Sequence, residues 1–334
     1  MTLKIKDIAE DAGVSIATVS RVLNNSQPVS QELRERVMSS VNRLGYRPNI
    51  LARGLRMKRT FVVGIIVPNI SNAYFTDIVR AAEDVALEAG YVVTVASSDQ
   101  DLVRERRYVD VLRNRLVDGA LVAVAHRFES DLTPLTGADV PVVLADRRLE
   151  GCTDCDSVTV DVRQGAAMAV AHLAQRGYQR IAMISGPLDV STAADKLDGY
   201  KQALSAHGLP VDDSLILMGD YTEESGVRLG RELLQRPDAP QAVLVANNLM
   251  TLGFFRVVQE FGLRVPHDIA FVSFDDSAWA SLVTPPVTLV DQPTYEVGRA
   301  AMELLLDRLE GDEARPSEPK HQVLRPTLIV RGSS

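Results

Sequence analysis

The sequence contains no hydrophobic run long enough to cross a membrane, because none approaches the roughly 18 consecutive apolar residues that a spanning helix requires. Its first residues, MTLKIKDIAEDAG, also lack the apolar stretch and the small-residue cleavage site of a signal peptide. The apolar content of 46% and the charged content of 24% are close to those of average globular domains. These features exclude an integral membrane protein and predict a cytoplasmic location with no membrane partner.

Cysteine is scarce, since the only two, Cys152 and Cys155, stand in the tetrapeptide CTDC. A structural zinc site normally needs two further ligands at a matching spacing, and none of the five scattered histidines supplies them. We therefore expect two unpaired thiols in a loop rather than a metal or redox centre. The sequence predicts no metal and no cofactor.

The common catalytic and nucleotide-binding motifs are missing as well. The sequence has no P-loop, no GxGxxG after a strand, no GxSxG and no HExxH spacing. The neighbouring carboxylates of Asp275 and Asp276 are candidates for acid–base chemistry, but adjacent residues at a strand end usually point apart. The sequence therefore predicts that the protein is not an enzyme, with catalysis as the remote alternative.

Charge is divided unevenly along the chain. The formal net charge is -8 overall, yet residues 1–60 carry 11 Lys and Arg against 5 Asp and Glu. The remaining residues carry 25 basic side chains against 39 acidic ones. A small basic segment ahead of a large acidic body suits a phosphate-binding head on a domain with another task. An incidental basic face is the alternative.

Three short helical patterns are present in the basic segment. Apolar residues recur at helical spacing up to Ala12, and Gly13 then permits a tight turn. Ser15 stands where an N-cap hydroxyl would begin a second helix, residues 16–24. The apolar stripe of this second helix is thin and consists of Val19, Val22 and Leu23.

Ser30 is predicted to cap a third helix that ends at Gly45. The first two helices, joined through a glycine turn, form a helix-turn-helix, in which the second helix enters the major groove of DNA. Its open side carries Thr18, Ser20 and Arg21. Small side chains let a helix approach base edges, and arginine can bond guanine through two parallel hydrogen bonds. An ordinary solvated helix face is the alternative that this pattern leaves open.

From residue 61 onward, apolar strand-like segments alternate with amphipathic helical segments. The strand candidates are FVVGIIVP, YVVTVA, GALVAVA, PVVLA, SVTV, RIAMISG, LILMG, QAVLVAN and IAFVSFDD. This alternation predicts parallel sheets covered by helices on both faces, and the number of strands fits two doubly wound sheets with a boundary near residues 160–163. The expected fold is an all-α helix-turn-helix headpiece followed by an α/β core of two parallel-sheet subdomains.

Three runs of the sequence resemble the LacI/GalR family of bacterial transcription regulators. They are IKDIAEDAGVSIATVSRVLN, VSQELRERVMSSVNRLGYRPNILARGLR and VVGIIVPNISNAYF, and the similarity continues through VSFDD to the C-terminus. The N-terminal run is highly specific, because the glycine turn, TVSRVLN, LGYRPN and ILARGLR occur in order at fixed separations.

The resemblance implies a domain organisation. Residues 1–48 correspond to a DNA-binding headpiece, residues 49–60 to a hinge helix and linker, and residues 61–334 to an effector-binding and dimerisation core like that of periplasmic sugar-binding proteins. Within the core we expect an N-subdomain of residues 61–160 and 290–320, and a C-subdomain of residues 161–289 and 321–331.

By this resemblance, Ile16, Ala17 and Arg21 occupy base-contacting positions. Ile16 and Ala17 offer only apolar contacts, such as those to thymine methyl groups, so hydrogen-bonded reading depends largely on Arg21. The remaining headpiece contacts lie nearer the phosphates and are Ser15, Thr18, Ser20 and Asn24.

Residues 49–56 correspond to the family hinge helix, so Asn49, Leu55 and Arg56 are predicted DNA contacts. In the family, a leucine wedges into the minor groove at the centre of a palindromic site, and here that residue is Leu55. An apolar wedge kinks the duplex. The energetic cost of the kink is offset by the additional protein–DNA contacts that the bend permits. We expect this helix to order only on DNA, paired with its dimer mate, because a short helix containing Gly54 cannot hold together alone.

Polar and aromatic residues follow several predicted strands and are candidate effector contacts, namely Tyr74, Phe75, Asp146, Arg147, Asn247 and Asp275. Ligands of doubly wound sheets bind beyond the carboxyl ends of the strands, so these residues are expected to converge on one cleft. Carboxylates and amides can hydrogen-bond sugar hydroxyls, while aromatic rings offer a flat face to a sugar or a nucleobase. A role as a cap or turn residue is the alternative for each.

Thr192, Lys196 and Tyr221 are added only because they align with the family's effector positions. Most relatives have arginine where this sequence has Lys196, and aspartate where it has Asn248. Lysine replaces a bidentate fork with one flexible ammonium. The effector therefore stays open between a sugar or polyol, our first choice, and a purine or nucleoside.

The sequence thus predicts a bacterial DNA-binding transcription regulator, most simply a repressor. It is expected to bind a pseudo-palindromic double-stranded operator as a homodimer, under the control of a small-molecule effector. An activator is one alternative, and a solute-binding protein is a remote one because of the basic head.

Overall fold

The computed structural model describes residues 3–24, 29–45, 59–114, 117–311 and 318–334. The chain forms two compact units, residues 1–60 and residues 61–334, which we call the headpiece and the core. Within the described ranges, no helix combines the length and the apolar character needed to span a bilayer.

The described part of the headpiece consists of α1 (Ile5–Ala12), α2 (Ile16–Asn24) and α3 (Gln31–Leu44). Gly13 adopts a φ of 62°, a left-handed conformation that favours glycine and turns the chain between α1 and α2. Val19 and Val22 of α2 are buried in a small core shared with α1 and α3, so the thin apolar stripe faces inward as predicted. The guanidinium of Arg36 donates to the carbonyl oxygen of Ala12 at 2.7 Å and satisfies the end of α1.

Helix capping in the headpiece confirms two predictions and corrects a third. The hydroxyl of Ser15 accepts a hydrogen bond from the backbone N–H of Thr18 at 3.1 Å and so caps α2. Gly45 ends α3 in the left-handed conformation, with a φ of 65°. Ser30 occupies the N-cap position of α3 through its carbonyl, which accepts from Arg34, but its hydroxyl makes no capping bond. The backbone of Ser30, and not its side chain, therefore begins α3.

The first sheet of the core has the strand order β11-β5-β4-β3-β1-β2, with every neighbouring pair parallel. Its strands are β1 (Val62–Val67), β2 (Val92–Ser97), β3 (Gly119–Val122), β4 (Val142–Ala145), β5 (Asp156–Val160) and β11 (His321–Leu324). The strands β3, β4 and β5 are buried along their whole length, as expected for a parallel sheet covered on both faces.

The second sheet has the order β12-β10-β9-β8-β6-β7, and only the edge pair β10–β12 is antiparallel. Its strands are β6 (Ile181–Ser185), β7 (Ile216–Met218), β8 (Ala242–Val245), β9 (Ala270–Phe274), β10 (Thr288–Asp291) and β12 (Thr327–Ile329). The two doubly wound parallel sheets predicted from the sequence are therefore present.

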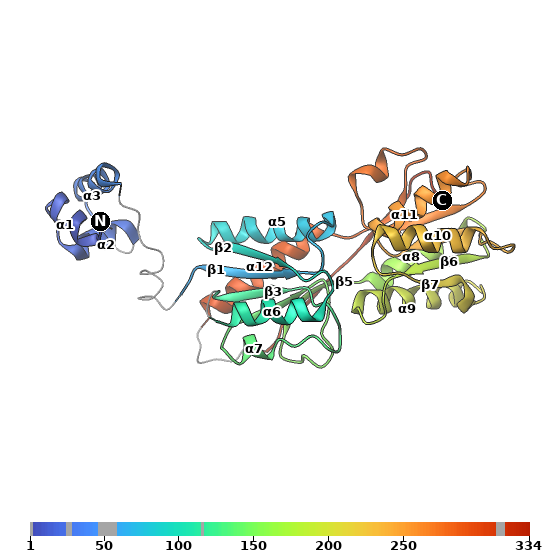
Figure 1. Cartoon of the computed structure of the whole chain (residues 1–334), viewed down its shortest axis with the longest axis horizontal. Coiled ribbons are helices and arrows are strands. Elements are labelled where there is room, and N and C mark those ends of the chain that lie inside the picture. The colour runs from blue at the N-terminus through green and yellow to red at the C-terminus, as the bar shows by residue number, and fades with distance from the viewer. Residues whose placement is uncertain (1–2, 25–28, 46–58, 115–116, 312–317) are drawn as a thin grey trace. The chain divides into compact units, whose positions relative to one another are not determined.

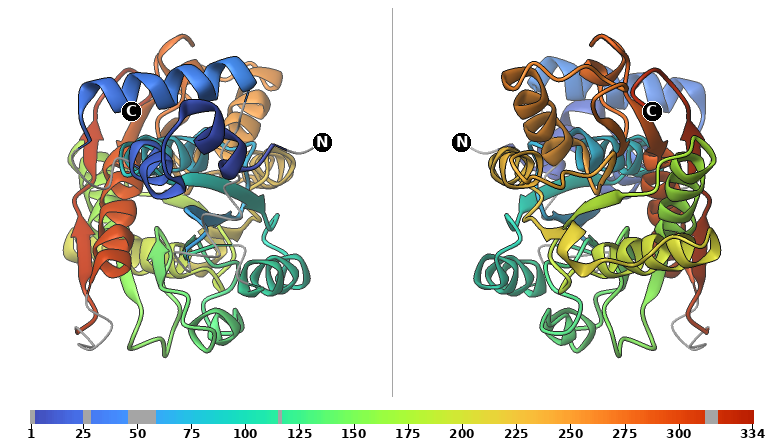
Figure 2. Two further views of the ribbon diagram at one scale, coloured as in Figure 1. Left: turned by 90° about the vertical axis from the view of Figure 1, so that its left-hand side faces the viewer. Right: turned by 90° about the vertical axis from the view of Figure 1, so that its right-hand side faces the viewer.

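Helices cover both faces of each sheet. In the N-subdomain, α5 (Ala73–Glu88) and α12 (Thr294–Glu310) pack together on one face, while α6 (Leu102–Arg113) and α7 (Thr133–Thr136) cover the other (Figure 1). In the C-subdomain, α8 and α9 form one pair, and α10 and α11 form the other pair across the sheet (Figure 2). Their bounds are α8 (Val162–Gln175), α9 (Ser191–Ala206), α10 (Glu223–Leu234) and α11 (Asn248–Glu260). Two 3₁₀ turns, η1 (Asp213–Leu215) and η2 (Ala278–Ser281), complete this subdomain.

The expected subdomain boundaries need correction near the C-terminus. Residues 321–331 were expected in the C-subdomain, and β12 does belong to the second sheet, but the residues of β11 pair with β5 and so belong to the first sheet. The strand β10 belongs to the second sheet, so the chain returns to the N-subdomain at α12 and not at residue 290. Both strands are short, and β11 is polar and exposed, so neither has the apolar run that would reveal its sheet.

The structure joins Cys152 and Cys155 in a disulfide, which corrects the expectation of two unpaired thiols. The turn between β4 and β5 brings their Cα atoms to 5.5 Å, within the range of about 4.4–6.8 Å that a disulfide requires. Composition and spacing do not reveal this turn, which is why the sequence favoured thiols.

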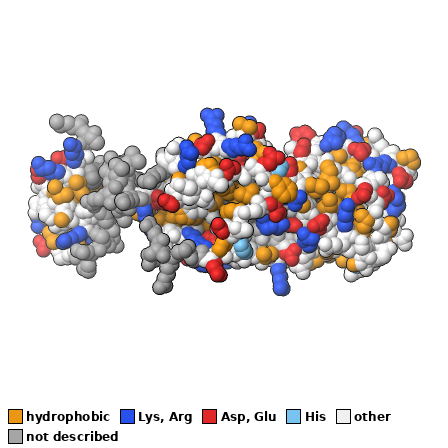
Figure 3. Space-filling model, turned by 90° about the horizontal axis from the view of Figure 1, so that it is seen from below, with side chains coloured by type: hydrophobic (Ala, Val, Ile, Leu, Met, Phe, Trp, Pro, Cys, Tyr) orange, Lys and Arg blue, Asp and Glu red, His pale blue; other side chains and the backbone are white. Residues whose placement is uncertain are grey.

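Charges of both signs are interspersed over the face of the core seen in Figure 3. Several ion pairs of the described core join residues four positions apart in the sequence, such as Arg299 with Glu303 and Arg264 with Asp268. The acidic excess of the core therefore does not form a single patch on that face.

Gly298→Ala is expected to force α12 away from α5. A Cβ at this position would lie 2.1 Å from the carbonyl oxygen of Ile78, which cannot move without its helix. We expect a loss of about 1–3 kcal/mol in stability, seen as a lower midpoint in thermal unfolding of the full-length protein. The matched control is Gly230→Ala on α10, where the nearest atom is a ring carbon of Phe254 at 3.2 Å. Equal midpoints for the two variants would contradict this packing.

Candidate functional sites

The outer face of α2 is the candidate nucleic-acid surface. Ile16 is 46% exposed, and Ser15, Ala17 and Arg21 are exposed beside it. Arg21 makes no hydrogen bond or ion pair with any described residue, so its guanidinium is available to a partner. The exposed isoleucine offers an apolar contact that the folded headpiece itself does not use.

The other predicted DNA contacts are described less completely. Thr18 and Ser20 are half-buried on α2, and the hydroxyl of Thr18 is 2.9 Å from that of Ser15. The side chain of Asn24 lies outside the described residues, as do Asn49, Leu55 and Arg56 of the predicted hinge helix.

A cavity of about 210 Å³ lies between the two subdomains of the core. All nine residues predicted as effector contacts line it, namely Tyr74, Phe75, Asp146, Arg147, Thr192, Lys196, Tyr221, Asn247 and Asp275. Seven more residues line the cavity and were not predicted from the sequence, namely Pro68, Asn69, Asn72, Asp99, Gln100, Thr222 and Gln292. Applying the strand-end rule to β2 and β10 would have found Gln100 and Gln292, because each follows the end of its strand.

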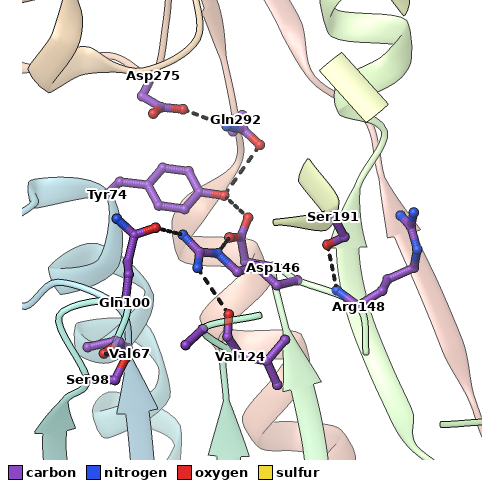
Figure 4. Close-up of polar contacts among 12 residues, drawn as sticks. Val67, Tyr74, Ser98, Gln100, Val124, Asp146, Arg148, Ser191, Asp275 and Gln292 are labelled. Carbon is purple, nitrogen blue, oxygen red and sulfur yellow. Dashed lines mark hydrogen bonds and ion pairs between the residues drawn. The ribbon is translucent and has the colours of Figure 1, made fainter. Parts of the chain in front are cut away.

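A chain of hydrogen bonds connects the two subdomains through this cavity (Figure 4). The hydroxyl of Tyr74 donates to Oδ1 of Asp146 at 2.6 Å and lies 3.4 Å from Oε1 of Gln292. The amide of Gln292 donates to Oδ1 of Asp275 at 2.5 Å. Asp146 follows β4 of the first sheet and Asp275 follows β9 of the second, so the chain links the strand ends of both sheets.

Two cations accompany the two buried aspartates. Arg147 donates to the carbonyl oxygen of Val124 at 3.0 Å, and its Nε lies 3.7 Å from Asp146. The ammonium of Lys196 donates to the carbonyl oxygen of Ala246 at 2.9 Å and lies 4.2 Å from the centre of the Phe274 ring. Each cation is therefore held by a backbone carbonyl rather than by solvent.

Burial shifts the acidity of these groups. It raises the pKa of Asp146, although Arg147 and the hydrogen bond from Tyr74 oppose this effect. It raises the pKa of Asp275 to about 6, against the opposing charge of Lys196. It also lowers the pKa of Lys196, an effect that Asp275 and Asp146 oppose. The site thus holds two carboxylates and two cations that stabilise one another away from water.

Backbone strain gathers at the same place. Seven non-glycine residues of the described chain adopt positive φ, and five of them line the cavity, which are Asp99, Gln100, Asp146, Tyr221 and Asp275. Left-handed backbone is unfavourable for side chains with a Cβ and persists only where the surroundings impose it. This concentration distinguishes the cavity from an ordinary gap between subdomains.

Tyr221 is positioned by close packing on glycine. A Cβ at Gly186 would lie 2.1 Å from the Tyr221 ring, so only glycine allows the ring to lie there. The amide of Asn247 donates to the carbonyl oxygen of Tyr221 at 3.2 Å, while its oxygen accepts from the backbone N–H of Met250 and caps α11. Lining the cleft and capping a helix were expected as alternatives for this residue, and Asn247 does both.

Comparisons with known proteins bear on both sites. Residues 4–49 match the family model for bacterial regulatory proteins of the lacI family, and residues 170–334 match that for a periplasmic binding protein-like domain. The chain is 40% identical over 306 residues to catabolite control protein A of Priestia megaterium, covering 91% of this chain and 92% of that protein.

Two solved structures are similar over nearly the whole length. The transcriptional regulator CelR–cellobiose complex has 36% identity and a TM-score of 0.76, with 99% of this chain and 100% of that chain covered. The Lac repressor dimer bound to operator and the anti-inducer ONPF has 29% identity and a TM-score of 0.87, with 100% and 99% covered.

Asp275→Asn is expected to stabilise the protein increasingly as pH rises. The raised pKa of Asp275 means that the folded state holds this proton more tightly than the unfolded state, so the wild type loses stability between about pH 4 and 6. The amide cannot ionise, so the free energy of unfolding should shift in favour of the variant by about 2 kcal/mol between pH 4.5 and 7.5. Urea unfolding at both pH values measures this difference.

The matched control is Asp139→Asn, because Asp139 shares the positive φ but is exposed. Its difference from the wild type should not change over this pH range. A pH-independent difference for the Asp275 variant as well would contradict the burial of an ionised carboxylate in the cavity.

Proposed function

The chain belongs to the lacI family of bacterial regulatory proteins and is a DNA-binding transcriptional repressor with an effector-binding domain, and we propose that its effector is a small neutral sugar or polyol held in the cavity between the subdomains. The observation that carries this proposal is the chain of Asp146, Tyr74, Gln292 and Asp275 across the cavity. Carboxylate, amide and phenol groups alternate along it, which matches the alternating donors and acceptors of vicinal hydroxyls.

The charge of the cavity favours a neutral ligand. Asp146 and Asp275 are balanced by Arg147 and Lys196, and the remaining lining carboxylate, Asp99, is paired with Arg104. A charged effector would therefore leave an unpaired charge in a buried site, which is unfavourable. Sugars and polyols bring hydroxyls without net charge.

The size of the cavity favours one small ring over a nucleoside. Its volume of about 210 Å³ is below the range of about 300–1,000 Å³ usual for drug-sized ligands. The rings of Phe75 and Tyr221 supply the flat apolar surface that a pyranose face needs. These aromatic faces could also stack on a nucleobase, so a purine or nucleoside is the second candidate. The sugar is supported by CelR, which is 36% identical and is described in complex with cellobiose.

On the DNA side, we infer that α2 reads the major groove. Ile16 and Ala17 would contact thymine methyl groups, Arg21 would bond guanine, and Ser15, Thr18, Ser20 and Asn24 would lie near phosphates. Asn49, Leu55 and Arg56 remain proposed minor-groove contacts. The protein acts as a homodimer on a pseudo-palindromic operator in the bacterial cytoplasm, which is supported by the likeness to the operator-bound Lac repressor dimer.

Thermal unfolding with candidate ligands tests the effector class. A ligand present at about 100 times its Kd stabilises the folded state by about 2.7 kcal/mol, which corresponds to a rise of several degrees in the midpoint. We expect such a rise for at least one of D-glucose, sorbitol and related monosaccharides or polyols, and none for adenosine or guanosine. Asp146→Ala should abolish the rise, whereas the exposed Asp139→Ala should keep it. A rise with nucleosides alone would establish the second candidate.

Arg21→Ala is expected to weaken operator binding by about 1–3 kcal/mol and to relax selectivity at one base pair of each half-site. The operator is first selected from a random duplex pool with the full-length wild type. Affinity for this operator and for random duplex is then measured at one fixed salt concentration. The control Lys6→Ala removes an exposed charge from α1 and should lower both affinities about equally. An unchanged selected sequence for the Arg21 variant would refute the assignment.

A further inference from the structure

Two buried asparagines meet across the cleft beside the effector cavity. Asn72 precedes α5 in the N-subdomain and is 5% exposed, while Asn248 begins α11 in the C-subdomain and is 3% exposed. The amide nitrogen of Asn248 donates to Oδ1 of Asn72 at 2.9 Å. We propose that this hydrogen bond is a latch that holds the two subdomains closed over the cavity.

The orientation of the Asn72 amide is fixed by its second role. Its Oδ1 also accepts from the backbone N–H of Tyr74 at 3.0 Å and so caps α5. An oxygen committed to this cap presents only an acceptor to the opposite subdomain. The group at position 248 must therefore donate, and an acceptor there would be repelled.

The latch is joined directly to the proposed effector contacts. Tyr74, whose N–H holds the Asn72 oxygen, also carries the hydroxyl bonded to Asp146. The backbone of Asn248 favours the ionised form of Asp275 and so opposes the rise in its pKa that burial causes. A ligand that moves Tyr74 or Asp275 thus acts on residues that support both halves of the latch.

Besides the buried Tyr74–Gln292 contact in the cavity, the subdomains meet at the rim of the cleft, where the contacts are weaker candidates. The amide of Gln100 donates to the carbonyl oxygen of Asp220 at 3.1 Å, and Arg148 pairs with Asp195 at 2.7 Å. These contacts lie at the exposed rim, and the side chain of Arg148 is 44% exposed. Exposed pairs contribute about 0–1 kcal/mol because water and salt screen them. When the donor of a buried hydrogen bond is replaced by an acceptor, the loss of stability is larger than for such an exposed pair.

The identity of residue 248 therefore determines closure. A carboxylate at this position would face the Asn72 oxygen that caps α5 and would be repelled by it. The asparagine of this chain supplies a donor instead. Its own Oδ1 is buried and finds no partner among the described residues, so the hydrogen bond to Asn72 is its only described side-chain hydrogen bond across the cleft.

The test introduces one carboxylate into either partner and expects opposite results. Asn248→Asp places an acceptor against an acceptor, so the cleft should open. Backbone hydrogen exchange in the first turns of α5 and α11 should then become roughly tenfold faster in the full-length protein. Asn72→Asp keeps the cap and receives the Asn248 amide on a carboxylate, so exchange there should be no faster than in the wild type.

Two controls separate closure from general damage. Asn248→Ala removes the donor without adding repulsion and should give a smaller acceleration than Asn248→Asp. Asn114→Asp makes the same change at an exposed residue and should have no effect. At pH 5 the substituted carboxyl of Asn248→Asp becomes partly protonated and can donate to Asn72, so its exchange should move back toward that of the wild type. Small-angle scattering should show a larger radius of gyration for Asn248→Asp at pH 7.5 only.

Equal acceleration in the Asn72→Asp and Asn248→Asp variants would overturn the proposal, as would identical behaviour of Asn248→Asp and Asn248→Ala at both pH values. If Asn248→Asp fails to fold, accelerated exchange in Asn72→Asp is sufficient to refute the latch. The inference rests on the proposed effector role of the cavity, but the experiment contains no effector. Its failure is therefore distinguishable from a failure of the sugar proposal.

Discussion

The burial of two aspartates in one cavity is the constraint on which the rest of the core depends. Asp146 follows a strand of the first sheet and Asp275 a strand of the second, and each has a cation and a hydrogen-bond donor from its own subdomain. Arg147, Lys196 and Gln292 supply those partners, and left-handed backbone at both aspartates aims the carboxylates inward. Strain and desolvation are tolerated because the two sheets hold the strand ends rigidly.

Much of this arrangement follows from local patterns in the sequence. Continuous apolar runs predict buried parallel strands. The strand-end rule predicts that Tyr74, Asp146 and Asn247 lie close together, and in the structure all three line one cavity. The stripe of Val19 and Val22 likewise predicts which side of α2 is buried. These features depend on residues a few positions apart, which is why sequence patterns capture them.

The features that were missed depend on pairings between distant residues. The polar strand β11 is identified only by its pairing with β5, and Gln292 enters the site because the short strand β10 ends there. The Cys152–Cys155 disulfide depends on a turn that composition does not reveal. The contact of Asn72 with Asn248 joins residues of two subdomains, and such a contact leaves no periodic pattern in the sequence.

The late return of the chain to its first sheet has a consequence for biosynthesis. The helix α12 covers β3, β4 and β5, yet it lies near the end of the chain, after five of the six strands of the second sheet. While the ribosome is still translating residues 161–291, α12 has not yet been synthesised, and the apolar surface of β3, β4 and β5 that it will pack against is not covered by it. Nascent chains stalled before α12 would therefore expose valine- and leucine-rich strands, the kind of surface that holdase chaperones bind during translation.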